Sequence, residues 1–351
     1  SLLIFSMIAC TSLASEEIIK VSIAPDDYPA LSFQNFTVQE MIPLETTEKN
    51  LMGMDLRIKF SDNRIAVMDE STTDKVHLFD SKGTIQSLRD FEFGEGEEMM
   101  VLSPFQDKAR VYKVSKNGNL SEAFELAYGA NSFATIEGGG FLFQGSYNLP
   151  FVSHRVIQTD AEGNIQHRFL KNDYENKMLP MTERNFFASD QGVFMLEIFN
   201  PNLYLHQGDS LKQVLNADFG TYNLPSNFWE VDLMDSFGKI NEDGFATFKA
   251  AFQQGGLMVI DIVVQKGRTI SKYILFKKGK EIYKLKAERD DDMLFYYPIG
   301  INSDEQVLFL TYRSILAKHA QEFPDAFSVD ALPEEDFDYP VLLQVKLNED
   351  L

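Results

Sequence analysis

Cysteine is almost absent from the 351-residue sequence: Cys10 is the only one, so no disulfide can form within the chain. Histidine is also scarce, because only five occur and none has the His-x-x-x-His or His-Glu-x-x-His spacing of a local zinc site. Residues 144–148 lack the second glycine of a Gly-x-Ser-x-Gly elbow. The glycine run at 137–141 lacks the lysine of a phosphate-binding loop and is typical of a hairpin turn. No catalytic residue and no metal site are therefore predicted.

Basic residues are outnumbered, since 32 Lys and Arg stand against 53 Asp and Glu, giving a net charge of −21. A surface of this sign repels phosphate backbones and anionic lipid headgroups, so no nucleic-acid partner is predicted. The acidic runs at 288–292 and 334–338 offer carboxylate oxygens to Ca²⁺, but neither has the spacing of a calcium loop. Solvated surface loops explain both runs, and no cofactor is predicted.

The first nine residues, SLLIFSMIA, are mostly apolar but too few to span a bilayer, and they have the size of a signal-peptide hydrophobic region. Residues 7–10 (MIAC) resemble the lipobox of bacterial lipoproteins, which implies cleavage before Cys10 and attachment of a lipid to its sulfur. Thr11 stands where an aspartate would resemble an inner-membrane retention signal, so an outer-membrane lipoprotein is expected, facing either the periplasm or the cell surface. The alternative is a buried N-terminal strand with an incidental cysteine.

Aromatic residues are abundant at 13%, with 30 Phe, and they suit the pleated, half-buried surfaces of β-sheets. Alternating apolar and polar residues predict four short antiparallel strands at 56–60, 64–68, 75–79 and 85–91. Gly83 suits the tight turn between the last two of these strands. Four such strands within residues 56–91 are typical of one β-propeller blade.

The strand–turn–strand pattern recurs along the chain, at 111–120, 156–165, 203–211 and 273–282. Its turn residues Gly83, Gly118, Gly163, Asp209 and Gly279 are separated by 35, 45, 46 and 70 residues. Propeller repeats have periods of about 40 to 50 residues, whereas an ordinary β-sandwich lacks this longer period. The longest interval predicts an insertion, which we place at 221–240.

The last repeat is expected at 294–301, 306–312 and 339–347, interrupted by a helix near 314–321. Together the repeats predict an all-β fold with six blades of four antiparallel strands.

Residues 41–53 and the blade that follows resemble the six-bladed β-propeller lipoproteins of Bacteroidetes-type bacteria, which are relatives of the NHL-repeat propellers. The resemblance rests on residues 42–46 (IPLET), on Asp69, on the Phe-Asp-x-x-Gly turn at 79–83 and on the final strand at 339–347. Residues 93–98 depart from the family, because they lack the proline of its Gly-x-Gly-Pro-Gly-Glu turn. The family has no settled activity, so the resemblance implies a fold and a cellular location rather than a reaction.

The resemblance also implies how the ring closes, with residues 36–44 supplying a strand to the blade that contains 339–347. N- and C-terminal strands would then share one blade and leave no exposed sheet edge there. The expected organisation is a signal-peptide remnant and lipobox at 1–10, a tether at 11–35 and a six-bladed propeller at 36–351.

Two predicted loops, 145–151 and 221–229, share a Tyr-Asn-Leu-Pro core and are about two repeats apart, so both can lie on one face of the wheel. Aromatic and asparagine side chains on loops suit stacking on sugars or contact with a protein partner. The candidate ligand-binding residues are Tyr147, Asn148, Tyr222, Asn223 and Trp229. The alternative is that these aromatic residues fold back onto the blades.

The sequence thus predicts a membrane-anchored envelope lipoprotein that binds a partner protein or a glycan through loops on one face, without catalysis. The alternative is a propeller lyase or metal-dependent hydrolase whose carboxylates or histidines converge at the central channel. A third possibility is a structural subunit of an envelope complex. Three or more converging Asp, Glu, Asn or His side chains at a channel mouth would favour the enzyme.

Overall fold

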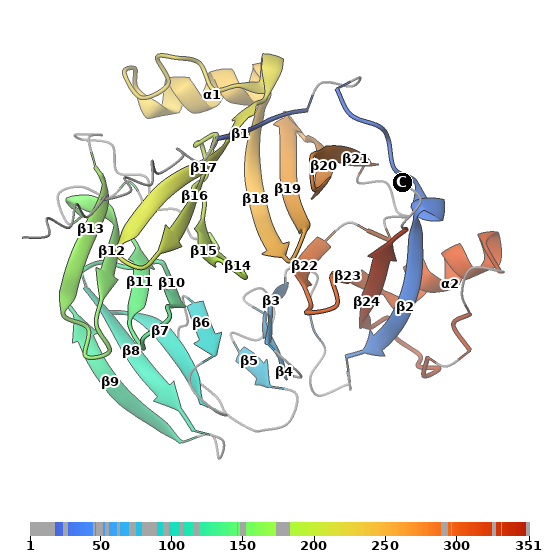
Figure 1. Ribbon diagram of the computed structural model, residues 1–351, viewed down its shortest axis with the longest axis horizontal. Helices are drawn as coiled ribbons and strands as arrows, with labels where there is room; N and C mark the ends of the chain where they lie inside the picture. The colour runs from blue at the N-terminus through green and yellow to red at the C-terminus, as the bar shows by residue number, and fades with distance from the viewer. Residues whose placement is uncertain are drawn as a thin grey trace, which may run out of the picture.

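The computed structural model describes residues 18–23, 27–44, 46, 52, 56–61, 64–69, 75–78, 90–93, 98–105, 108–115, 119–145, 147, 152–172, 183–288, 294–295, 297–324, 328–330 and 332–348. Within them, short twisted sheets stand side by side around a common centre (Figure 1). The innermost strand of each sheet contacts the innermost strand of the next, so the sheets are the blades of a wheel.

The described strands form six blades, and neighbouring strands within each blade are antiparallel, apart from the N-terminal strand β1 (Ile19–Ser22), which pairs in parallel at the edge of blade 4. Blade 1 contains β3 (Leu56–Ser61), β4 (Arg64–Asp69) and β5 (Lys75–Leu78). Blade 2 contains β6 (Asp90–Phe93), β7 (Met99–Phe105), β8 (Lys108–Val114) and β9 (Leu120–Leu126). Blade 3 contains β10 (Ser132–Thr135), β11 (Phe141–Gln144), β12 (His154–Thr159) and β13 (Ile165–Lys171).

Blades 4 and 5 are linked in one continuous sheet by a single parallel bridge between Ser189 and Gln253 of their innermost strands. Blade 4 contains β14 (Phe186–Ser189), β15 (Gly192–Met195), β16 (Asn202–Gln207) and β17 (Ser210–Asp218). Blade 5 contains β18 (Phe245–Gln254), β19 (Leu257–Lys266), β20 (Thr269–Lys278) and β21 (Glu281–Glu288).

Blade 6 joins the two ends of the chain. It contains β22 (Tyr297–Ile301), β23 (Val307–Tyr312), β24 (Pro340–Leu347) and, at its outer edge, the N-terminal strand β2 (Phe36–Pro43). Phe36 lies opposite Leu347, and Pro43 lies opposite Val341. The predicted ring closure is therefore present, and its register puts the apolar side chains of β24 into the core.

The repeated turns lie where the sequence pattern predicts them. In blades 3 to 5 the turn joins the third strand to the fourth, and Gly163 and Gly279 have positive φ angles of 85° and 60°. Gly118, between the third and fourth strands of blade 2, lies outside the described residues. In blade 4 the residue with positive φ is Gly208, at 59°, rather than the adjacent Asp209. Glycine adopts this backbone conformation without the steric cost that a Cβ brings, which explains the difference.

The first blade differs from its prediction at its fourth strand. Asp90 and Phe91, which end the predicted strand at 85–91, belong to β6 and pair with β7 of blade 2. The remainder of that segment and the turn at Gly83 lie outside the described residues. An apolar alternation identifies a strand but does not say which sheet the strand joins, because that depends on the turn before it.

Two helices interrupt the strands where insertions are predicted. Between β17 and β18 lie a 3₁₀ turn, η2 (Gly220–Tyr222), and α1 (Leu233–Asp243), which begins where the Asp232 carboxylate accepts a hydrogen bond from the Met234 amide at 2.9 Å. In blade 6, α2 (Arg313–Glu322) connects β23 to β24. Within the described part of the chain, no helix is long and apolar enough to cross a membrane.

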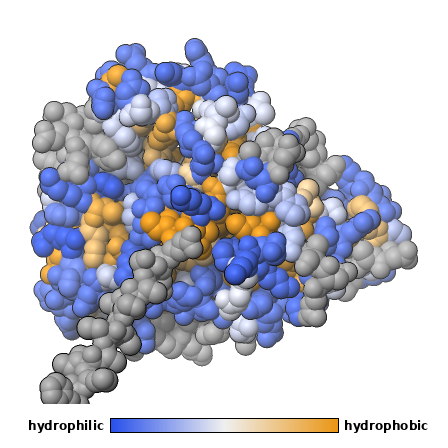
Figure 2. Space-filling view, turned by 45° about the horizontal axis from the view of Figure 1, so that its top comes forward, coloured by the Kyte–Doolittle hydropathy of each residue, from blue (hydrophilic) through white to orange (hydrophobic). Residues whose placement is uncertain are grey.

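Apolar side chains fill every contact between neighbouring blades. Phe248 and Ile260 belong to the cluster between blades 4 and 5, and Phe309 and Leu343 to the one between blades 5 and 6. Four smaller clusters occupy the remaining contacts between blades. Figure 2 shows the outside, where hydrophilic residues cover most of the visible surface and hydrophobic ones gather across its middle.

The segment expected to be a tether is packed against the wheel wherever the structure describes it. Strand β1 (Ile19–Ser22) pairs in parallel with β17 as a fifth strand of blade 4. Farther along, the Leu31 amide donates to the Lys284 carbonyl at 2.8 Å, and the Lys284 amide donates to the Pro29 carbonyl at 2.9 Å. Burial of Val21, Ile23 and Leu31 favours this attachment over a free linker.

We expect strand β1 to contribute measurably to stability. A chain that begins at Asp27 loses the burial of Val21 and Ile23, worth roughly 3 kcal/mol or more, and should unfold at a Tm several degrees below that of a chain that begins at Ile18. Thermal unfolding followed by circular dichroism measures the difference. Equal Tm values for the two chains would contradict this role of β1.

Candidate functional site

An open cavity of about 460 Å³ lies where blades 3 and 4 meet the connection between β17 and β18. Its polar and aromatic lining includes Arg155, Asn200, Asn202, Tyr204, Asn223 and Trp229, and we call it the Trp229 cavity. Strands β12 and β16 begin on this side of the wheel, and β17 ends on it, because neighbouring strands run in opposite directions. The β17–β18 connection adds its loop beside them.

Tyr147 and Trp229, one from each of the two predicted loops, meet beside this cavity. The rings of Tyr147 and Trp229 lie 4.6 Å apart, centre to centre. Tyr147 is only 2% exposed, and its hydroxyl donates to the Ile198 carbonyl at 3.2 Å. Its ring therefore supports Trp229 from within the protein instead of facing a ligand.

The other candidate residues have different surroundings. Tyr222 is half-buried against the core between blades 4 and 5. Asn223 lines the cavity, where its side chain accepts from the Phe219 amide at 3.0 Å and donates to the Asp218 carboxylate at 2.7 Å. Asn148 and Cys10 lie outside the described residues. The cavity thus includes Asn223 and Trp229 of the predicted set.

A buried carboxylate that sequence reasoning missed organises the cavity wall. Glu197 is fully buried, and its carboxylate accepts from Arg155 Nε at 2.8 Å and from Asn200 Nδ2 at 3.0 Å. Arg155 also donates to the Lys171 carbonyl at 2.8 Å. One carboxylate therefore holds a cation and an amide in place across the contact between blades 3 and 4. A single Glu inside the apolar run at 194–199 is the sequence signal that could have identified it.

The asparagine side chains retain hydrogen-bonding capacity for a ligand. The Asn202 side-chain oxygen accepts a hydrogen bond from Asn216 Nδ2 at 2.8 Å. The side-chain nitrogen of Asn202 has no hydrogen-bond partner within the described residues. The Asn200 oxygen accepts from the Asn202 amide at 3.0 Å. Each amide carries two donor hydrogens and two acceptor lone pairs, so bonds to the protein fix the orientation of these groups without exhausting them.

Phe199 lines the cavity and has a strained backbone conformation. Its φ angle is 62°, in the left-handed region that favours glycine, and its ring lies within 6.5 Å of the rings of Phe228, Phe245 and Trp229, centre to centre. A non-glycine residue in this region costs of order 1 kcal/mol and persists only where its surroundings hold it. Here the aromatic cluster compensates for that cost and keeps Trp229 in place.

Glu183, just before β14, is a second, half-buried acid of this region. Its carboxylate accepts from Asn185 Nδ2 at 2.9 Å and from the Ile198 amide at 3.1 Å. The pKa of Glu183 is raised to about 7, chiefly by burial and to a smaller extent by the nearby Glu197. The two hydrogen bonds and the charge of Lys249 oppose this rise. The same Asn185 accepts from the Ser132 hydroxyl at 2.6 Å, which links the network to blade 3.

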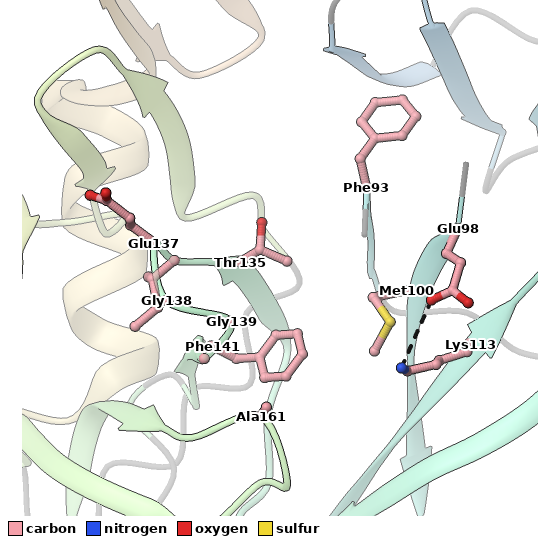
Figure 3. Close-up of a pocket in the computed structure, with 12 residues that line it drawn as sticks. Phe93, Glu98, Met100, Lys113, Thr135, Glu137, Gly138, Gly139, Phe141 and Ala161 are labelled. Atoms are coloured by element: carbon pink, nitrogen blue, oxygen red, sulfur yellow. Dashed lines mark ion pairs between the residues drawn. The ribbon is translucent and has the colours of Figure 1, made fainter. Parts of the chain in front are cut away.

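A second cavity, of about 480 Å³, lies between blades 2 and 3 (Figure 3). One wall carries Met100 and an ion pair between Glu98 and Lys113 at 3.8 Å, and the other carries the ring of Phe141 and the turn at 136–140. This turn is the predicted hairpin between β10 and β11. Gly138 and Gly139 have φ angles of 90° and 88°, with open space where a Cβ would stand.

Among the residues that the structure describes, no three His, Cys, Asp or Glu side chains are placed to hold a metal ion together.

The model of the DUF5128 family, described as a 6-bladed beta-propeller, matches residues 10–309 of the chain. The chain belongs to this propeller family. A similar solved structure is that of an exported protein of Bacteroides fragilis NCTC 9343, with a TM-score of 0.71 and 14% identity, covering 95% of this chain and 100% of that chain. At this identity the likeness shows the fold alone.

Two further solved structures are less similar. A streptogramin B lyase has a TM-score of 0.39 and 14% identity, covering 90% of this chain and 100% of its own. A gluconolactonase of Xanthomonas campestris has a TM-score of 0.39 and 9% identity, covering 78% of this chain and 82% of its own. A search of the curated proteins found no match.

The family match and the observed sheets confirm the predicted all-β, six-bladed propeller. Lipid attachment at Cys10, outer-membrane location and kinship with NHL repeats stay predictions.

The ionisation of Glu183 should make the stability of this propeller depend on pH. The unfolded chain loses the Glu183 proton near the ordinary pKa of 4.5, whereas the folded chain keeps it to about 7. The stabilisation by the bound proton is complete below pH 4.5 and is lost as the pH rises through 7, by up to about 3 kcal/mol.

Glu183→Gln should therefore be more stable than the natural protein at pH 8, and its free energy of unfolding should fall less between pH 5 and pH 8. Urea unfolding at several pH values measures both effects. Glu162→Gln, on the exposed turn between β12 and β13, is the matched control. Parallel pH profiles for the natural protein and Glu183→Gln would show that this carboxyl does not titrate as described.

Proposed function

We propose that the protein is an exported, lipid-anchored propeller of the bacterial outer membrane that binds a glycan in the Trp229 cavity. The observation that supports this proposal is an open cavity that combines an aromatic ring with oriented asparagine side chains and an arginine. A sugar presents C–H groups on one face, which pack on aromatic rings, and hydroxyl groups at its edge, which require donors and acceptors.

The geometry favours a neutral or weakly polar ligand at this site. Arg155 is the one charged side chain among the described residues of the cavity wall, and Glu197 neutralises it at 2.8 Å. Within the described residues the side-chain nitrogen of Asn202 has no hydrogen-bond partner, and Asn200 keeps part of its hydrogen-bonding capacity. Amide groups of this kind bond to hydroxyls without requiring charge on the ligand.

The location is supported by two separate observations. Residues 7–10 resemble a lipobox, and β1 attaches the chain to blade 4 only nine residues after Cys10. The B. fragilis protein with the same fold is described as an exported protein. A thioether lipid on Cys10 would hold the propeller at the membrane surface, although one acyl chain alone anchors weakly and a lipoprotein carries more.

Glycan binding should change the fluorescence of Trp229, which is the only tryptophan of the chain and lines the cavity. Titration with a panel of envelope oligosaccharides should give a saturable change for at least one of them. Asn202→Ala should weaken that binding about tenfold, because it removes hydrogen bonds to a buried ligand.

Asn227→Ala is the matched control, since Asn227 is exposed in the loop that carries Trp229 but does not line the cavity. This variant should bind like the natural protein. A fluorescence change that Asn202→Ala leaves intact would place the ligand elsewhere, and no change with any oligosaccharide would contradict glycan binding.

Lipid attachment is tested separately in a Gram-negative host grown with an alkyne-labelled fatty acid. The natural protein should take up the label and sediment with outer membranes, whereas Cys10→Ser should remain unlabelled because the sulfur that forms the thioether is gone. Equal labelling of both proteins would contradict a lipid on Cys10.

A further inference from the structure

The cavity between blades 2 and 3 lies on the opposite face of the wheel from the Trp229 cavity. Strand β12 begins on the side of the Trp229 cavity, and it is antiparallel to both β11 and β13. The β10–β11 turn and the β12–β13 turn therefore lie on the other side, and residues of both turns line this second cavity of about 480 Å³. A ligand here does not compete for space with one in the Trp229 cavity.

The floor of the cavity is apolar and comes from both blades. Phe93 and Met100 belong to β6 and β7 of blade 2, and Phe141 belongs to β11 of blade 3. All three line the cavity although each is at most 9% exposed, so they form its deepest part. In Figure 3 the ring of Phe141 points from its own wall toward Met100 on the facing wall. An apolar group between them is removed from water, and an aromatic ring also gains a favourable contact with the Met100 sulfur.

The rim of the cavity carries two opposite charges side by side. The Glu98 carboxylate and the Lys113 ammonium of blade 2 lie 3.8 Å apart, and their side chains are 48% and 51% exposed. This distance exceeds that of a hydrogen bond, and neither side chain has another partner within the described residues. Both groups therefore keep their hydrogen-bonding capacity for a ligand.

The facing wall contributes one further charge. Glu137 is exposed, and its side chain forms no ion pair or hydrogen bond within the described residues. Gly138 and Gly139 have open space where a Cβ would stand, so the backbone of their turn is accessible at the cavity. The charged residues of the described lining are thus two acids, Glu98 and Glu137, and one base, Lys113. This balance disfavours a ligand whose only charge is negative.

We propose that the cavity between blades 2 and 3 binds a small zwitterion, an α-amino acid with an apolar side chain. Such a ligand carries its ammonium and its carboxylate on one carbon atom, so its two charges lie side by side as those of Glu98 and Lys113 do. The ammonium pairs with Glu98 and the carboxylate pairs with Lys113, while the side chain enters the apolar floor. Each charge then has a partner of opposite sign, which a ligand with a single charge cannot provide.

The size and lining of the cavity suit a ligand of this class. Cavities that bind small molecules have volumes of roughly 300 to 1,000 Å³ and are mostly apolar, with a few polar groups that fix the orientation of the ligand. Here Phe93, Met100 and Phe141 form the apolar part, and Glu98 and Lys113 form the orienting part. A longer ligand would extend along the accessible backbone of the turn.

Isothermal titration calorimetry of the full chain tests the site with four probes. L-Phenylalanine has all the proposed features, whereas phenethylamine lacks the carboxylate, 3-phenylpropionate lacks the ammonium, and glycine lacks the side chain. We expect saturable heat with phenylalanine and an affinity about fivefold or more lower for each of the other three, because each loses one set of contacts. No saturable heat with phenylalanine, or equal affinity for any of the other three, would overturn the proposal.

Two exposed residues are substituted to locate the binding. Glu98→Gln should weaken the binding of phenylalanine about fivefold without weakening that of 3-phenylpropionate, which has no ammonium. Lys113→Gln should weaken phenylalanine by a similar factor and strengthen phenethylamine, because it removes a cation that competes for Glu98. Unchanged affinity for phenylalanine in both variants would overturn the site.

Two control variants should bind phenylalanine like the natural protein. Glu281→Gln removes an exposed acid at the start of β21 in blade 5, far from this lining, and so separates a local effect from one of net charge. Trp229→Ala changes the cavity on the opposite face and so separates this site from the proposed glycan site. Weaker binding in Glu281→Gln to the same extent as in Glu98→Gln would contradict a site at Glu98.

Discussion

The pairing of β2 with β24 is the contact on which the rest of the structure depends. It joins Phe36 to Leu347 across almost the whole chain, and no local contact can replace it. Each blade is a thin sheet that must cover both of its faces with neighbouring blades, because one sheet cannot bury enough apolar surface alone. Closing blade 6 completes the apolar contacts on both of its sides, with blades 5 and 1. Such a long-range pairing forms late in folding, since its loop-closure entropy must be overcome first.

Polar contacts between blades add specificity to this apolar ring. Asp90 of blade 2 binds Arg57 and Lys59 of blade 1 and the Phe133 amide of blade 3, so one carboxylate relates three blades. Burial opposes the ionisation of Asp90, but these partners together hold its pKa below the ordinary value. Buried ion pairs contribute little net stability compared with apolar contacts, whereas removing one partner leaves the other charge buried and unpaired. Their consequence is a fixed alignment of neighbouring sheets, and the Arg155–Glu197 pair does the same at the Trp229 cavity.

In this propeller, side chains from different blades come together at only a few places. Loops and strand ends of neighbouring blades meet on one side, where the inserted segment between β17 and β18 brings Trp229 against Tyr147. Arg184, just before the innermost strand of blade 4, donates to the Ile58 carbonyl of blade 1 and so connects blades on opposite sides of the wheel. The Trp229 cavity is rich in amides and aromatic rings, and its residues are far apart in sequence and brought close only by the ring.

The sequence by itself determined the fold. Its strand–turn–strand period predicted six blades and the two insertions, which became α1 and α2, because alternation and turn residues are local properties that survive in the folded protein. The pairing of the terminal strands was implied by the family resemblance, and it is present in the structure. It also placed two Tyr-Asn-Leu-Pro loops on one side of the wheel. Tertiary structure decided what each residue does there: Tyr147 became a buried support, Trp229 stayed at the cavity, and residues 19–22 became a strand of blade 4 instead of a tether. The partners of Glu197, Arg155 and Asn200, could not be predicted, because they depend on the contact between blades 3 and 4 and not on any local pattern.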